Sequence, residues 1–277
     1  MRKITVSSVL AALLAGVPSA MYGPSNSAPS GHTLVATSYE YTFQAPDSIA
    51  GGVVTVRLVN RGKIGHQLAL ALLDDSSSLT RVMQSLVADK AHTGGVRWMG
   101  GVEGAAAGQS AETTIHLPPG RYVLVCSFEA DNGHAHVSMG MIRPLVVTPA
   151  APGSVAALPA APTTIRLTDY RIALSAPLHS GRQLVRVENG GPHRHHLNIT
   201  RIVGNATLAE IDKWDGKSKP APLADMSGGV AVLDPQGAGV IDLNLTPGRY
   251  LFSCVLSDDA KSKPHFMLGM EQEITIE

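Results

Sequence analysis

The sequence contains one structural unit twice. The segment Leu117-Pro-Pro-Gly-Arg-Tyr-Val-Leu-Val-Cys126 matches Leu245-Thr-Pro-Gly-Arg-Tyr-Leu-Phe-Ser-Cys254 at an offset of 128 residues. At an offset of 129, Asn60 aligns with Asn189, His66 with His195, and Gly140-Met141 with Gly269-Met270. Because the offset between matching residues stays at 128 or 129 along the whole unit, the chain is an internal duplication. Any fold it adopts must therefore be built from two similar units.

A segment rich in Pro and Ala separates the two copies. Residues 150–162 carry this composition, which cannot form a packed element and suits a semi-rigid, extended linker. We therefore predict one domain over residues 32–149 and a second over residues 163–277.

The N-terminus has the features of a secretory signal. Arg2 and Lys3 precede an apolar stretch over residues 6–17, and small residues follow around Ser19 and Ala20. This pattern predicts a signal peptide over residues 1–22 and a flexible segment over residues 23–31. An uncleaved membrane anchor is the alternative. We expect export to the periplasm or the extracellular space, with no stable membrane insertion after cleavage.

Composition favours strands and gives no charge-based partner. Apolar residues make up 44% of the chain, and 22 basic side chains balance 22 acidic ones, so no net field favours nucleic acid or anionic lipid. The chain has 28 Gly and 18 Pro, which suit short strands and tight turns.

Local patterns within each copy predict strands and one short helix. Residues 53–59 alternate between apolar and polar, as do residues 184–188. Apolar residues with helical spacing predict a helix over 79–87 behind Ser76–Ser78, and a shorter one over about 207–214. Gly100-Gly101 is interpreted as a turn. The predicted fold class is all-β, with two tandem Greek-key β-sandwiches, each with one short helix.

Each copy also carries a Cys, a His and a Met in the same order. The first copy has the spacing C-x9-H-x4-M and the second C-x10-H-x4-M, and one further His lies at the start of an apolar strand upstream in each. A thiolate, two imidazoles and a weak axial thioether are the donor set that holds copper between the geometries of its two oxidation states. The candidate ligands are His66, Cys126, His136 and Met141 in the first copy, and His195, Cys254, His265 and Met270 in the second.

These motifs resemble the cupredoxins, the blue copper protein family. The family pattern is N-x5-H, then G-x-Y-x-x-x-C, then a ligand loop that ends in H-x4-M. The first copy presents it as Asn60 and His66, Gly120-Arg-Tyr122 and Cys126, then His136 to Met141; the second presents it as Asn189 and His195, Gly248-Arg-Tyr250 and Cys254, then His265 to Met270. The resemblance implies cupredoxin-like domains with a type 1 copper site in each copy, for one or two copper ions.

The loops between Cys and His depart from this pattern. Both are longer than in plastocyanin-like members, and the second contains the polar segment Ser257–Pro264. That segment is expected to hold His265 away from the sulfur of Cys254, so copper is expected more strongly in the first domain.

Other uses of these residues remain open. The cysteines could be small buried hydrophobes or form a Cys126–Cys254 disulfide, and the methionines could fill the core. The additional histidines His134, His193 and His196 are interpreted as polar loop residues, with a second, exposed copper site as the alternative.

The function that these observations favour is single-electron transfer or copper carriage, with a redox partner protein or a copper donor or acceptor as the partner. We favour a carrier over a catalyst, because the His-Cys-His arrangement of multicopper oxidases is absent around both cysteines. The alternatives are a metal-free module for binding or structure and a copper oxidoreductase with an interdomain site. The sequence carries no interface signature that predicts an oligomeric state.

Overall fold

A computed structural model describes residues 32–88, 94–150, 152–153, 157–214, 220–258 and 262–277. The predicted signal peptide (1–22) and flexible segment (23–31) lie outside the described residues, as do residues 151 and 154–156 of the predicted linker. No helix in the described part of the chain is long and apolar enough to cross a membrane.

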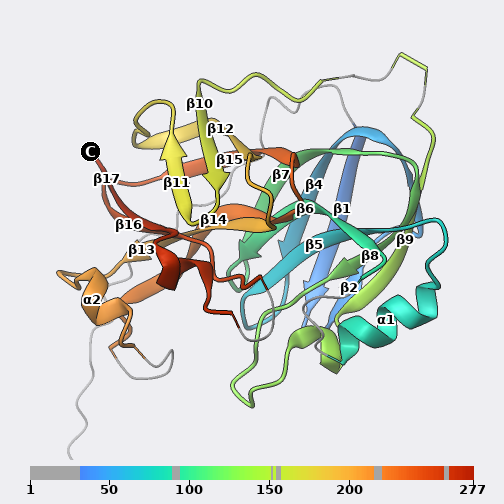
Figure 1. Cartoon of the computed structure of the whole chain (residues 1–277), viewed down its shortest axis with the longest axis horizontal. Coiled ribbons are helices and arrows are strands. Elements are labelled where there is room, and N and C mark those ends of the chain that lie inside the picture. Colours follow the sequence, from blue (N-terminus) through green and yellow to red (C-terminus); the bar gives the residue numbers. More distant parts are fainter. Residues whose placement is uncertain (1–31, 89–93, 151, 154–156, 215–219, 259–261) are drawn as a thin grey trace, which may run out of the picture.

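The described part of the chain is mostly β-strand, and its two halves have the same succession of elements except that β3 has no counterpart in the second half (Figure 1). The first half contains β1 (His32–Tyr39), β2 (Thr42–Gln44), β3 (Ser48–Ala50), β4 (Gly52–Asn60), β5 (His66–Leu73), α1 (Leu79–Val87), β6 (Val96–Ala105), β7 (Ser110–Leu117), β8 (Gly120–Val125), the 3₁₀ helix η1 (His136–Met139) and β9 (Ile142–Thr148). The second half contains β10 (Thr163–Thr168), β11 (Arg171–Leu174), β12 (Gly181–Asn189), β13 (His195–Ile202), α2 (Leu208–Ile211), β14 (Leu223–Leu233), β15 (Ala238–Leu245), β16 (Gly248–Ser253), η2 (His265–Leu268) and β17 (Glu271–Ile276).

Both predicted helices are present and begin at side-chain caps. The Ser78 hydroxyl accepts a hydrogen bond from the Arg81 N–H at the start of α1. Thr207 and Glu210 form a capping box at the start of α2, which is only four residues long. These caps satisfy backbone donors that the first helical turn leaves without a partner.

Each half forms a sandwich around its own hydrophobic core. In the first, β2-β1-β4-β7 faces β3-β9-β8-β5-β6; in the second, β11-β10-β12-β15 faces β17-β16-β13-β14. The alternation predicted for residues 53–59 is found in β4, where Val54, Val56 and Leu58 are fully buried in the first core. Cys126 and Met141 lie in this core, and Cys254 and Met270 lie in the second.

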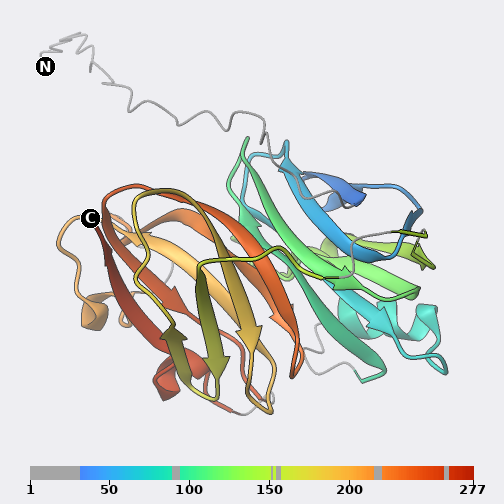
Figure 2. The same ribbon diagram turned by 90° about the horizontal axis from the view of Figure 1, so that it is seen from above.

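The two sandwiches are joined edge to edge, so their sheets are continuous. Strand β7 pairs with β15, and β6 pairs with β14, which gives one eight-stranded and one nine-stranded sheet across the molecule (Figure 2). At the second junction, the Trp98 N–H donates to the Asp234 carboxylate (3.0 Å), and the Asp234 N–H donates to the Trp98 carbonyl (3.0 Å). The duplication did not predict this junction.

The interpretation of Gly100-Gly101 as a turn is wrong, because both residues lie within β6. Gly101 has φ +127°, and a Cβ there would lie 2.1 Å from the Leu68 carbonyl oxygen. Its counterpart Gly229 in β14 has φ +138°, with a Cβ position 1.9 Å from the Leu197 carbonyl oxygen. Glycine is required at these points because adjacent strands approach too closely for a side chain.

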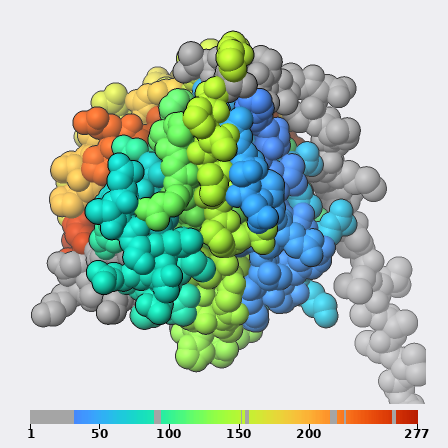
Figure 3. All heavy atoms as spheres, turned by 90° about the vertical axis from the view of Figure 1, so that its right-hand side faces the viewer, coloured from blue at the N-terminus to red at the C-terminus, as the bar shows by residue number. Residues whose placement is uncertain are grey.

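On one face of the first sandwich, its N-terminal strands lie beside its last strand, β9. Figure 3 shows β9 (yellow-green) between the N-terminal strands (blue) and the region of α1 (teal). Strand β3 pairs in parallel with β9 and is the edge strand of the nine-stranded sheet, only three residues long.

Candidate metal centres

Three elements bring His66, Cys126 and His136 together. His66 is the first residue of β5, Cys126 directly follows β8, and His136 is the first residue of η1. One donor atom from each lies within 4.8 Å of the others, and all three residues are buried. The strand that ends at the cysteine and the loop that follows it therefore place the predicted residues at one point.

The atoms that face one another are the two Nδ1 atoms and the thiol sulfur. His66 Nδ1 lies 3.3 Å from His136 Nδ1, and Cys126 Sγ lies 3.4 Å from His136 Nδ1. The Gln67 N–H donates a hydrogen bond to the sulfur (3.3 Å). Burial, and then the positive charge of a protonated His136, lowers the pKa of His66 to about 4, so this imidazole is a neutral donor near pH 7. Burial raises the pKa of Cys126 to about 12, so its thiol keeps a proton until a cation replaces it.

The three donors fit a metal ion. Lone pairs that face one another repel unless a proton or cation lies between them. Imidazole nitrogens at about 2.0 Å and a thiolate at about 2.3 Å from one ion would lie about 3.3–3.7 Å apart in trigonal or tetrahedral geometry. The first group has two of these separations, at 3.3 and 3.4 Å.

The second group has the same arrangement. His195 Nδ1 lies 3.2 Å from His265 Nδ1, and Cys254 Sγ lies 3.5 Å from His265 Nδ1. The prediction that the polar loop Ser257–Pro264 holds His265 away from the sulfur is therefore wrong. Asp258, on this loop, accepts a hydrogen bond from His265 Nε2 (2.8 Å), so the loop fixes the imidazole in place.

The pKa of the Cys254 thiol depends on the protonation state of His196. Burial raises the pKa of the Cys254 thiol, whereas a protonated His196 and hydrogen bonds from the neighbouring histidines would lower it to about 4. The Val255 N–H, however, donates to His196 Nε2 (2.8 Å), so that nitrogen carries a lone pair and the imidazole is neutral, with its proton on Nδ1. A neutral His196 has no positive charge to lower the pKa of Cys254, whereas burial still raises it.

The two groups differ in the partners of their outer imidazole nitrogens. Because Nδ1 faces the ligand cluster, a neutral imidazole carries its proton on Nε2. In the second group His195 Nε2 donates to Asp169 (3.2 Å) and His265 Nε2 to Asp258. Among the described residues, neither His66 Nε2 nor His136 Nε2 has a hydrogen-bond partner. The counterpart of Asp169 is Glu40, whose carboxylate instead accepts from the Lys63 N–H.

The carboxylates of the second group are held ionised. Partial burial raises the pKa of Asp258, but hydrogen bonds from Tyr170 and His265 outweigh it, and the net pKa is lowered. At Asp169, the hydrogen bonds from His193 and His195 likewise outweigh burial and lower the pKa. Both carboxylates can therefore accept hydrogen bonds from the imidazole N–H groups near pH 7.

Met141 and Met270 lie next to these groups through the backbone. The Cys126 N–H donates to the Met141 carbonyl (3.2 Å), and the Cys254 N–H donates to the Met270 carbonyl (3.1 Å). Both methionines are fully buried. Their role as weak axial ligands stays a prediction.

The sequence interpretation missed two tyrosines that cover the groups. The Tyr41 ring packs edge-on against His136, with centroids 5.1 Å apart, and Tyr170 packs against His265 at 5.3 Å. Both are non-glycine residues with positive φ, 61° and 60°. Such backbone strain clusters at functional sites. Their alignment at the offset of 129 that also aligns His66 with His195 is the signal that could have identified them.

The other predictions for Cys and His have mixed outcomes. Both cysteines are free and buried, each beside the histidines of its own sandwich, so they form no disulfide here. His134 and His193 are exposed residues outside the strands, as predicted. The loop prediction for His196 is wrong, because it is a buried residue of β13 that contacts Glu103.

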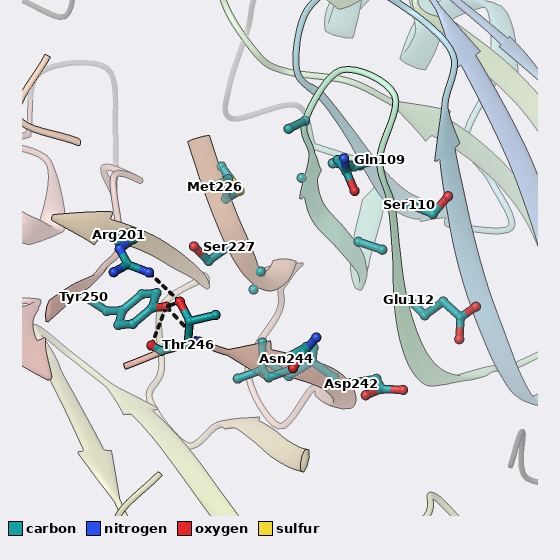
Figure 4. Close-up of a pocket in the computed structure, with 18 residues that line it drawn as sticks. Gln109, Ser110, Glu112, Arg201, Met226, Ser227, Asp242, Asn244, Thr246 and Tyr250 are labelled. Carbon is teal, nitrogen blue, oxygen red and sulfur yellow. Dashed lines mark hydrogen bonds between the residues drawn. The ribbon is translucent and has the colours of Figure 1, made fainter. Parts of the chain in front are cut away.

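A separate pocket of about 310 Å³ lies at the junction of the sandwiches. Its lining contains none of the six His and Cys donors. Its Arg201 already donates to Thr246 (Figure 4) and also to the Pro247 carbonyl. In the part of the chain that the structure describes, the two groups above are the His and Cys clusters suited to a metal ion.

Comparison with known proteins gives structural similarity only. No protein-family model and no curated protein sequence matches the chain. Among solved structures, it is similar to a dithionite-reduced auracyanin from Roseiflexus castenholzii (21% identity, TM-score 0.30), over 43% of this chain and 99% of that one. It is also similar to a copper-containing nitrite reductase from Thermus scotoductus (14% identity, TM-score 0.24), over 89% of this chain and 61% of that one. A multicopper oxidase is similar over 92% of this chain and 93% of that one (14% identity, TM-score 0.25).

At these scores the assignment rests on the molecule itself. The duplicated pattern of strands, the cysteine after the penultimate strand of each half and the two buried His, Cys and His clusters are independent observations. The chain is a tandem pair of cupredoxin-like β-sandwiches.

Proposed function

We propose that this protein is an exported copper protein that transfers single electrons, with His66, Cys126 and His136 holding one ion and His195, Cys254 and His265 the other. The observation that carries the proposal is that two imidazoles and a buried thiol meet in both halves: the two Nδ1 atoms lie 3.3 and 3.2 Å apart, and the sulfur lies 3.4 and 3.5 Å from the Nδ1 of the second histidine. Met141 and Met270 are the proposed axial ligands. Copper carriage between a donor and an acceptor is a variant of the same proposal.

The donor chemistry favours copper. Thiolate and imidazole together suit copper and zinc, but a thiolate with two imidazoles and a nearby thioether is the set that serves copper electron transfer. When bound, copper would supply a one-electron redox couple.

The protein would contribute rigidity. Each ligand set comes from the start of one strand, the end of another and a 3₁₀ helix, and each is buried in a packed core. The Gln67 and His196 N–H groups donate to the two sulfurs (3.3 and 3.5 Å) and would stabilise thiolate charge. A site fixed in this way reorganises little when its charge changes, which favours electron transfer over catalysis.

A visible spectrum tests the proposal. We expect the purified protein to develop an intense blue or green thiolate–copper band with Cu²⁺. Cys126→Ser and Cys254→Ser should each remove part of the band, the double variant all of it, and the exposed-histidine control His116→Gln none. A wild-type protein without this band would contradict the proposal. Copper-dependent oxygen consumption with a phenolic substrate would favour the oxidoreductase alternative.

Export is proposed from the charged and apolar character of residues 1–22. N-terminal sequencing of the protein from a periplasmic or culture-fluid fraction should give a mature chain that begins near residue 23. Recovery of an intact Met1 in the membrane fraction would contradict export with cleavage.

A further inference from the structure

Three buried polar side chains connect the two candidate metal centres. Gln67, Glu103 and His196 are 4%, 1% and 3% exposed. Glu103 lies on β6, the strand that joins the first sandwich to β14 of the second. A carboxylate so deeply buried is costly unless its oxygens are hydrogen-bonded.

Both Glu103 oxygens have a partner, one from each sandwich. Gln67 Nε2 lies 2.9 Å from Glu103 Oε2, and His196 Nδ1 lies 2.7 Å from Glu103 Oε1. One carboxylate of the first sandwich is therefore shared between the two halves.

Two backbone groups fix the direction of these hydrogen bonds. The Ser127 N–H donates to Gln67 Oε1 (3.2 Å), which leaves the Gln67 amide nitrogen to donate to Glu103. The Val255 N–H donates to His196 Nε2, which leaves the proton on Nδ1. Glu103 thus accepts on both oxygens, as an ionised carboxylate does.

The outer ends of this chain of hydrogen bonds are the two thiols. Gln67 and His196 each follow the first histidine of their site, and their own N–H groups donate to Cys126 Sγ and Cys254 Sγ. Ser127 and Val255 each follow the cysteine. The contacts therefore run continuously from one sulfur to the other.

Glu103 breaks the duplication at this point. At the offset of 128 that aligns Gly100-Gly101-Val102 with Gly228-Gly229-Val230, Glu103 aligns with Ala231, which is fully buried. One carboxylate therefore serves both halves.

We propose that Glu103 is a shared positioning residue that orients the hydrogen-bond donors of both thiolates and so couples the two metal centres. This inference rests on the proposed metal sites. Glu103 touches no candidate ligand; it acts through Gln67 on one side and through His196 on the other. Its negative charge would also favour the more positive oxidation state of an ion bound at either centre.

The test measures each site separately with Co²⁺, whose thiolate and d–d bands report occupancy. Site 1 is titrated in the Cys254→Ser background and site 2 in Cys126→Ser. We expect Glu103→Gln to weaken both sites by about tenfold or more, the usual effect of losing an outer-shell partner. Glu112→Gln, the same change of charge on strand β7 of the opposite sheet, should alter neither site.

A second variant separates the Glu103–Gln67 hydrogen bond from the Glu103–His196 hydrogen bond. Gln67→Met leaves Glu103 in place and removes only the donor on the side of site 1. It should weaken site 1 by a similar factor and shift the cobalt–thiolate band of site 2, although it lies wholly in the first sandwich. An unchanged site 2 in Gln67→Met, or an effect of Glu103→Gln on one site only or on neither, would overturn the coupling.

The metal-free protein provides an independent readout. If the bridge holds Gln67 and His196, their amide hydrogens should exchange faster with solvent in Glu103→Gln, while those of β12 stay unchanged. If the wild type takes up no metal, the proposed function fails, and amide exchange still decides on the bridge. Equal exchange at both amides in wild type and Glu103→Gln would refute it.

Discussion

Two centres with the same ligand residues differ in what holds their imidazoles. His195 and His265 each donate to a carboxylate, whereas the outer nitrogens of His66 and His136 have no partner among the described residues. A carboxylate partner fixes the ring and makes the metal-facing nitrogen more basic. We therefore expect the second centre to bind divalent ions more tightly than the first.

Asp258→Asn tests this difference. The substitution keeps the size of the side chain but removes the charge that holds His265, so the second centre should lose about 10–100-fold in divalent-metal affinity. Titration with Co²⁺ in the Cys126→Ser background measures it. Asp242→Asn, which removes a carboxylate paired with Arg182 on the surface, is the matched control. An unchanged affinity in Asp258→Asn would show that the loop carboxylate plays no part.

The sequence predicted which His and Cys residues cluster but not their hydrogen-bond partners. His66, Cys126 and His136 were predicted because Cys and His recur in both copies at matching positions. Their partners differ between the copies, as Asp169 and Glu40 do, so repetition does not identify them. Glu103 and His196 are 93 residues apart and meet only because β6 and β14 are paired, which no local pattern reveals.

At the level of single elements, the centres depend on how closely strands pack. Strand β13 begins with His195 and His196, and it pairs with β14 around Gly228 and Gly229. The Cβ position of Gly229 lies 3.0 Å from the Glu103 Cβ atom as well as against the Leu197 carbonyl. A glycine in this strand therefore gives Glu103 its space.

Gly229→Ala should be far more costly than an ordinary glycine substitution. It combines a strained φ with a collision against backbone, so we expect more than about 3 kcal/mol of destabilisation. Gly204→Ala, at φ +58° with no atom near its Cβ position, should cost only about 1–2 kcal/mol. Denaturant unfolding of both variants measures the difference, and equal losses would contradict the steric account.

Elements were predicted where their own residues determine them. The capped, amphipathic segment 79–87 and the alternating segment 53–59 carry their signal locally. Gly100 and Gly101 were misinterpreted because a glycine pair is found both in turns and in crowded strands, and the local sequence does not distinguish the two. The neighbour that distinguishes the two cases, the Leu68 carbonyl, belongs to another strand.

At the scale of the whole molecule, two sandwiches share two sheets. The pairs β7–β15 and β6–β14 use backbone hydrogen bonds. Across the junction, the Trp98 N–H donates to the Asp234 carboxylate, and Arg194 of the second sandwich donates to the same carboxylate. The duplication predicted two units, but the sequence does not show which edges meet, because strand edges carry no residue pattern of their own.

The shared sheets predict cooperative unfolding. Calorimetry of the full chain should give one transition with equal calorimetric and van't Hoff enthalpies. Asp234→Ala leaves the Trp98 N–H without its acceptor and should lower the free energy of unfolding by about 1–3 kcal/mol. Asp47→Ala, which removes an exposed ion pair with Arg143, should have little effect. Two separate transitions in the wild type would contradict the prediction.

The edge-to-edge junction also gives the chain an order of assembly. The ribosome makes the first half before β14 and β15 exist. Until then β6 and β7 are edge strands with unpaired backbone groups, and they can pair with a strand of another molecule. Two such molecules could complete each other by exchanging their second halves, as intertwined dimers. For this chain, delayed folding until the C-terminal half has emerged would be a safeguard against that exchange.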